Sequence, residues 1–171
     1  MLDVDSSLLN ELVSVQHKFI RRMLGLSDRS MIMMLFTETG LWPIRYRRII
    51  IAITYLQYLL QLPPNHYARA ALEECVFLDA VGKPSWLTDL RIVMLRLPGS
   101  SISLPGNMVG MTALDCQTVI DCVKKACVAE CRAFVAGSVK AVLIQERVLK
   151  DDDNAVLSMR KYLIDVAVPK Y

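Results

Sequence analysis

Two proline boundaries enclose the most apolar stretch of this chain. Trp42-Pro43 precedes the stretch and Pro63-Pro64 follows it. Proline is favoured at the first position of a helix, and inside a helix it cannot donate the backbone hydrogen bond that the structure needs. The two boundaries therefore predict a helix that starts at Pro43 and runs to about Leu62.

Polar residues form only a narrow stripe on this predicted helix, namely Arg47, Thr54, Gln57 and Gln61. A helix that is apolar around most of its circumference is typical of the middle of a core, and we expect this one there. The apolar run, residues 49–62, is shorter than the ~18 residues that a membrane span requires. No membrane segment is predicted.

Turn signals and helical spacing divide the rest of the chain into further helices. Over residues 6–24, apolar side chains recur at Leu8, Leu12, Val15 and Phe19, which is the spacing of one helical face, and Gly25 ends the segment. The other predicted helices are 31–39, stopped by Gly40; 65–80, ending near Gly82; 86–97, capped near Ser85; 112 to about 150, with a break at Gly137-Ser138; and 155–166. Strand patterns are lacking, so the predicted fold class is all-α, an irregular bundle of about six to seven helices without a sheet.

One internal boundary is predicted. The chain has 171 residues, enough for one domain of ordinary size. Residues 98–110, PGSSISLPGNMVG, have the composition of a loop between a helical region at 1–97 and a helical C-terminal part at 111–171 of the same bundle. Apolar residues make up 54% of the chain. This share is above the usual value of roughly 45–50%, which indicates apolar surface meant for a partner.

The cysteines and histidines do not predict a metal or catalytic site. Cys116, Cys127 and Cys131 share one helical face, which is typical of buried free thiols, and their spacing fits no zinc pair. His17 and His66 have no obvious nucleophile partner, and the Asp151–Asp153 run is best explained as a solvated helix start. We predict no cofactor and no enzymatic activity. The acidic N-terminus does not resemble a signal peptide, so an intracellular location is expected.

Positive charge is concentrated in residues 16–48, which hold seven Lys and Arg against two Asp and Glu, whereas the whole chain has a net charge of only +3. Such clustering is typical of a surface that contacts phosphate backbones without reading sequence. Nearby Phe19, Trp42 and Tyr46 could stack on bases or pack in the core. The predicted nucleic-acid-binding residues are Lys18, Arg21, Arg22, Arg45, Arg47 and Arg48. An internal structural role for the arginines is the alternative.

Residues 16–72 carry a resemblance to a known family. They contain an RR-x-LGL block, then Leu35, Glu38 and Gly40–Pro43, then a basic cluster that enters an apolar helix. This order resembles the helical region after the polymerase domain in fungal non-LTR retrotransposon reverse transcriptases. The resemblance implies a thumb-adjacent helical segment that supports the polymerase and contacts the template–primer backbone, and it also implies a nuclear location.

The chain departs from that family in its catalytic parts. The F/Y-x-D-D turn that holds the polymerase metal ions is missing, as are the family's endonuclease and its cysteine–histidine knuckle. The sequence is therefore expected to be a non-catalytic fragment or a transposable-element remnant. Its expected partners are RNA or DNA backbone and the missing polymerase domain. The alternative prediction is a helical protein–protein interaction module that docks a partner, or self-associates, through an exposed apolar face.

Overall fold

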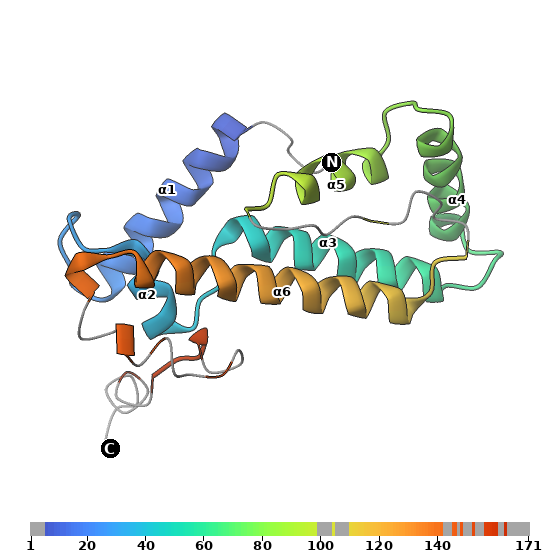
Figure 1. Cartoon of the computed structure of the whole chain (residues 1–171). Helices are drawn as coiled ribbons and strands as arrows, with labels where there is room; N and C mark the ends of the chain where they lie inside the picture. The colour runs from blue at the N-terminus through green and yellow to red at the C-terminus, as the bar shows by residue number, and fades with distance from the viewer. Residues whose placement is uncertain are drawn as a thin grey trace, which may run out of the picture. The chain divides into compact units, whose positions relative to one another are not determined.

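The computed structural model describes residues 6–98, 104, 110–141, 145, 146, 148, 152, 156–160 and 163. Within these residues the helices are joined by turns and irregular segments, and strands are lacking (Figure 1). The elements are α1 Ser6–Met23, α2 Ile32–Thr39, α3 Ile44–Gln61, α4 Tyr67–Ala80, α5 Trp86–Leu95, α6 Ala113–Ala136 and a short 3-10 helix at Val139–Ala141. The predicted all-α fold class is confirmed.

The described chain divides into two compact units. The first unit combines the start of α1, up to Leu9, with Arg45–Ala126, and it holds α3, α4, α5 and the larger part of α6. The second unit combines Asn10–Ile44 with the described residues from Cys127 onward. Each unit thus draws on both halves of the sequence. The predicted loop at 98–110 lies almost entirely outside the described residues.

Glycines end three helices near the predicted positions. After α1, Gly25 has φ +65°, the Leu26 N–H donates to the Arg21 carbonyl at 2.8 Å, and the Gly25 N–H donates to the Arg22 carbonyl at 3.2 Å. This pattern is a Schellman motif, which needs a left-handed residue that glycine adopts without strain. Gly40 after α2 and Gly82 after α4 have similar φ values of +69° and +70°.

Side-chain caps set the first residues of three helices. Ser85 Oγ accepts the Thr88 N–H at 3.2 Å, as predicted for α5, and the Thr112–Asp115 pair forms a capping box before α6. His66 Nδ1 accepts the Ala68 N–H at 3.1 Å. Because this cap lies at His66, α4 begins at Tyr67, two residues later than predicted.

The long C-terminal helix is interrupted at the predicted break. Helix α6 ends at Ala136, at the predicted break, and the Gln145 side-chain amide lies 3.0 Å from the Val135 carbonyl and 3.2 Å from the Ala136 carbonyl. These contacts supply hydrogen-bond donors to carbonyls that have no partner within the helix at its C-terminal end. Of the predicted final helix at 155–166, the structure describes residues 156–160 and 163. Residues 157–160 form a turn and irregular chain, so the prediction of a continuous helix there was wrong.

Helix α3 corrects one prediction. It begins at Ile44, one residue after Pro43, and it buries a single face, with Tyr46, Ile49, Ile53 and Leu56 each 0% exposed. Its opposite face leaves Ile51, Tyr55 and Tyr58 more than half exposed. The prediction of a helix enclosed by the core was therefore wrong, because an apolar circumference does not require that every side be covered.

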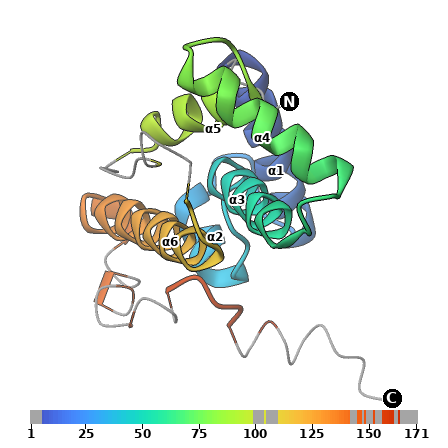
Figure 2. The ribbon, with the colours of Figure 1, turned by 90° about the vertical axis from the view of Figure 1, so that its right-hand side faces the viewer.

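In the first unit, α4 and α5 form a helical hairpin (Figure 2). The Arg91 Nη2 of α5 lies 2.6 Å from Asp79 Oδ2 of α4, and Thr88 Oγ1 donates to Asp79 Oδ1 at 3.0 Å. Arg91 Nη1 also donates to the Leu104 carbonyl at 2.9 Å. The Arg91 hydrogen bond is the main reason that the pKa of Asp79 is lowered from its ordinary value.

Candidate functional site

One side of α1 packs inside the second unit. Ile20 is 0% exposed, and the His17 ring lies 5.7 Å from the Phe36 ring of α2. The Gln16 amide bridges the start of α3, because its Nε2 donates to the Trp42 carbonyl and its Oε1 accepts the Ile44 N–H, each at 2.8 Å. These contacts fix which way α1 faces.

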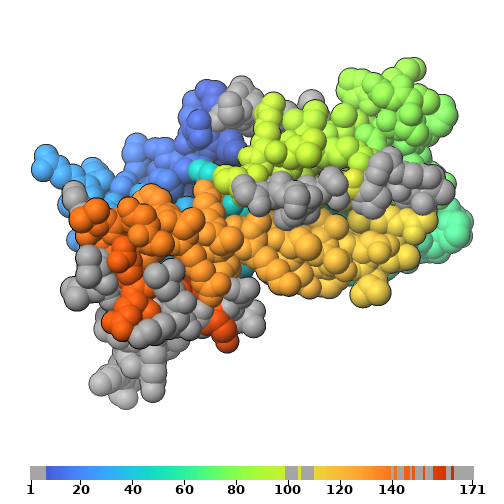
Figure 3. All heavy atoms as spheres, in the orientation of Figure 1, coloured from blue at the N-terminus to red at the C-terminus, as the bar shows by residue number. Residues whose placement is uncertain are grey.

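The opposite side of α1 is apolar and open to solvent. We call it the outer face of α1 and define it by Leu8, Leu12, Val15, Phe19 and Met23, which are 50%, 50%, 64%, 60% and 50% exposed. The atoms of α1, drawn in blue, lie at the surface in the view of Figure 3. Single exposed apolar residues are ordinary, but a continuous stripe over about four helical turns is typical of interaction surfaces, which makes this face a candidate site.

A charged edge borders the outer face. Glu11, Lys18 and Arg22 are all exposed, and they follow one another at spacings of seven and four residues, so they lie along one edge of α1. Glu11 lies toward the N-terminal end of this edge, and the two cations lie toward its C-terminal end. The outer face thus has an acidic end and a basic end.

The six predicted nucleic-acid-binding residues are not gathered in one unit. Lys18, Arg21 and Arg22 lie in the second unit, where Arg21 donates to the Ser30 side chain and carbonyl at 3.3 and 3.0 Å. Arg45, Arg47 and Arg48 lie in the first unit. Lys18, Arg22 and Arg47 are exposed, whereas Arg21, Arg45 and Arg48 are half-buried.

Arg47 shares the exposed face of α3 with aromatic residues. Counting along the helix places Arg47, Ile51, Tyr55 and Tyr58 on one side. The rings of Tyr55 and Tyr58 are stacked with centroids 6.2 Å apart, and the Trp86 ring meets Tyr55 edge-on at 5.9 Å. Of the aromatics singled out from the sequence, Phe19 is exposed, Trp42 is half-buried and Tyr46 is fully buried. The sequence analysis did not single out Tyr55 and Tyr58 as candidate binding residues. Their helical spacing from Arg47 would have placed them on the same face.

The buried thiols were predicted correctly. Cys116, Cys127 and Cys131 are each 0% exposed, whereas Cys122 is exposed. Burial raises the pKa of Cys116 to about 11, and a hydrogen bond from Cys127 lowers the pKa of Cys131. In the part of the chain that the structure describes, no three His, Cys, Asp or Glu side chains gather as metal ligands would.

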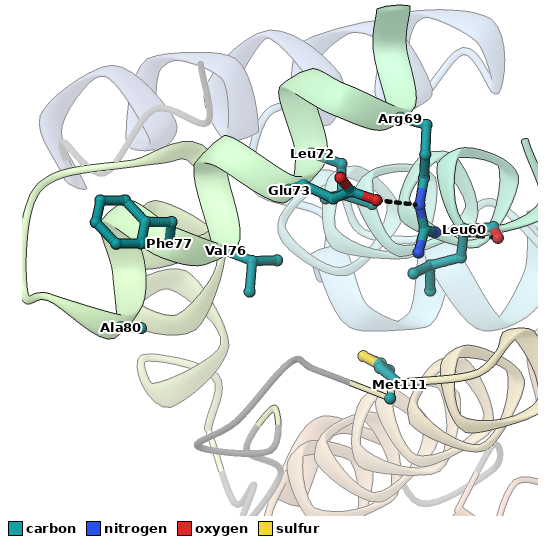
Figure 4. A pocket seen from close by; sticks show the side chains of 9 residues that line it. Leu60, Arg69, Leu72, Glu73, Val76, Phe77, Ala80 and Met111 are labelled. Atoms are coloured by element: carbon teal, nitrogen blue, oxygen red, sulfur yellow. Dashed lines mark hydrogen bonds and ion pairs between the residues drawn. The ribbon is translucent and has the colours of Figure 1, made fainter. Parts of the chain in front are cut away.

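A hollow of about 490 Å³ lies in the first unit between α3, α4 and the segment before α6 (Figure 4). Leu60, Val76 and Met111 border it, and Arg69 and Glu73 lie at one side. Arg69 Nε lies 3.3 Å from Glu73 Oε1, and Arg69 Nη1 donates to the Leu60 carbonyl at 3.1 Å. These polar groups are engaged with each other, so the hollow is a weaker candidate than the outer face of α1.

No family model matches this chain, and neither curated proteins nor solved structures yield a match. The resemblance to reverse transcriptases therefore stays a prediction. Among the described residues, helices of the length and hydropathy needed to cross a membrane are lacking.

Proposed function

We propose that this protein is a non-catalytic helical module that binds a protein partner through the outer face of α1. The observation that carries the proposal is the stripe of five apolar side chains, each at least half exposed, on a helix whose opposite side is packed. Burying apolar area releases ~25 cal/mol per Å². A partner that covers this stripe would therefore gain several kcal/mol before the cost of association is subtracted.

The family prediction is compatible with this proposal. A helical segment next to a polymerase thumb would bury one face against the polymerase, and the outer face of α1 is a surface of that kind. We keep the origin in a retrotransposon reverse transcriptase as part of the proposal.

Hydrophobic-dye binding tests the proposal. We expect the folded protein to bind a naphthalene sulfonate dye, and we expect Val15→Glu to remove at least half of the fluorescence because it places a charge in the centre of the stripe. Asn10→Glu is the matched control, since Asn10 is exposed on the other side of α1. Equal dye binding by both variants and the wild type would contradict the proposal, provided that circular dichroism shows all three folded.

A second candidate function is contact with nucleic acid through the exposed face of α3. The specific observation is that exposed Arg47 lies on the same side as Tyr55 and Tyr58. A cation and stacked aromatic rings are the groups that bind single strands without sequence preference. Arg45 and Arg48, which lie in the same unit as Arg47, would add backbone contacts in this candidate.

Fluorescence anisotropy with a labelled single-stranded oligonucleotide tests the second candidate. We expect affinity to fall as salt rises, and we expect the Arg45/Arg47/Arg48→Ala triple variant to bind about 10-fold or more weakly. The Lys124→Ala and Lys125→Ala variants, in α6, are the controls, because they remove positive charge at positions outside α3. Unchanged affinity of the triple variant would remove this candidate.

A further inference from the structure

The outer face of α1 follows the spacing of a coiled-coil seam. Leu12 and Phe19 are seven residues apart, and Leu8 and Val15 form a second series with the same spacing, four residues before Leu12 and Phe19. Alternating steps of three and four residues are the a and d positions of a heptad. Leu12 and Phe19 are then a positions, and Leu8 and Val15 are d positions. The next d position is Arg22, so the apolar seam runs from Leu8 to Phe19, and Met23 lies beside its end at an e position. This face therefore fits another helix better than it fits a flat surface.

The charges beside the seam indicate which helix fits. Glu11 and Lys18 both fall at g positions, one heptad apart on the same edge of α1, and both are exposed. When two helices pair in opposite directions, the g edges of the two helices face each other. A second copy of α1 in this orientation brings Glu11 of each copy opposite Lys18 of the other.

The parallel arrangement lacks this match. In a parallel pair, the g edge of one helix faces the e edge of the other, and the e positions here are Leu9, Gln16 and Met23. It would also place the basic ends of both copies side by side. The antiparallel pair separates those ends and opposes the helix dipoles.

We infer that the partner of the outer face of α1 is a second copy of this chain, paired antiparallel through α1. The inference rests on the proposed docking function and names its partner. In the pair, Leu12 of each copy packs against Val15 of the other, and Leu8 packs against Phe19. The seam from Leu8 to Phe19 is only about 17 Å long at the helical rise of ~1.5 Å per residue, so we expect the dimer to form at micromolar rather than nanomolar concentration.

Sedimentation velocity over a concentration series tests the inference through a charge exchange. We expect the wild type to shift toward twice the monomer mass as concentration rises. Glu11→Lys should weaken dimerisation about 10-fold, because Lys18 of each copy then faces a lysine of the other copy. Lys18→Glu should weaken dimerisation to a similar extent, because Glu11 of each copy then faces a glutamate. The double variant Glu11→Lys/Lys18→Glu should return to within about 3-fold of the wild type, since both pairs are restored with their signs exchanged.

Three outcomes decide the matter. Recovery of dimerisation in the double variant supports antiparallel self-pairing. A partner of another sequence would not carry the exchanged charges, so its binding would not recover. A wild type that stays monomeric at ~500 µM overturns the inference, as does a double variant no better than its single parents. If the inference fails while dye binding still depends on Val15, the proposed docking function stands with a different partner. Circular dichroism excludes unfolding in each variant.

Discussion

Gly40→Ala is expected to destabilise the protein by about 3 kcal/mol. Gly40 caps α2 with φ +69°. A residue with a Cβ costs ~1–2 kcal/mol in this left-handed conformation. A Cβ on Gly40 would also overlap the Met159 backbone nitrogen and lie 2.8 Å from the Ser158 carbonyl carbon. Both contacts are backbone atoms, which cannot rotate away as a flexible side chain could, and overpacking of this kind costs ~1–3 kcal/mol.

The contact at Gly40 holds the segment 156–160 against the end of α2. The Arg160 N–H donates to the Glu38 carbonyl at 3.0 Å, next to the close approach at Gly40. We expect Gly40→Ala to break this hydrogen bond as well as strain the cap. Urea unfolding followed by circular dichroism measures the loss.

Gly25→Ala is the matched control for Gly40→Ala. Gly25 caps α1 with φ +65°, but nothing lies within 4 Å of the position that its Cβ would take. Its substitution should therefore cost only the backbone term, about 1 kcal/mol. Equal costs at the two glycines would show that the segment 156–160 does not pack on Gly40.

Asp79→Asn is expected to destabilise the protein by about 2 kcal/mol at neutral pH. The Asp79 and Arg91 side chains are only 11% and 21% exposed. Removing one charge of a largely buried, hydrogen-bonded pair leaves the other charge incompletely compensated.

Glu73→Gln is the control for Asp79→Asn. The Glu73 pair with Arg69 is longer, at 3.3 Å, and the Glu73 side chain is 62% exposed. Exposed ion pairs contribute little, so we expect this substitution to change the free energy of unfolding by less than about 0.5 kcal/mol. Urea unfolding of both variants measures the difference.

The cost of Asp79→Asn should also depend on pH. Because the folded state lowers the pKa of Asp79, chiefly through the Arg91 hydrogen bond, the carboxylate stabilises the fold fully above its ordinary value of 3.8. This contribution is lost as pH falls through the lowered folded-state pKa. Urea unfolding at neutral pH and at successively lower pH should show the wild type and Asp79→Asn converging in the acid range. A constant difference across that range would contradict the role given to Asp79.

The helix boundaries could be predicted because they depend on local chemistry. Pro43 and Pro63 bracket α3, Gly25 and Gly40 end α1 and α2, and Ser85 caps α5, each through bonds within a few residues. The direction in which a helix faces is not local. The spacing of Leu12, Val15 and Phe19 predicted one apolar face of α1, but only the tertiary contacts of Gln16, His17 and Ile20 show that this face is left open.

The candidate site was therefore only partly predictable. Clustered charge in residues 16–48 drew attention to both α1 and the start of α3, and the structure assigns those cations to different units. The Asp79–Arg91 pair could not be predicted either. It joins residues 12 positions apart on two helices, and their meeting depends on the geometry of the turn between α4 and α5.

Site-specific photo-cross-linking from position 15 tests the role of the outer face of α1 most directly. Benzoylphenylalanine would replace Val15 in one sample and Asn10 in a control, and mixing isotopically light and heavy protein separates cross-links between copies from those within one copy. The account predicts cross-links from position 15 of one copy to residues 8–15 of another, with few from position 10. Cross-links confined to single copies, or equally frequent from both positions, would contradict it.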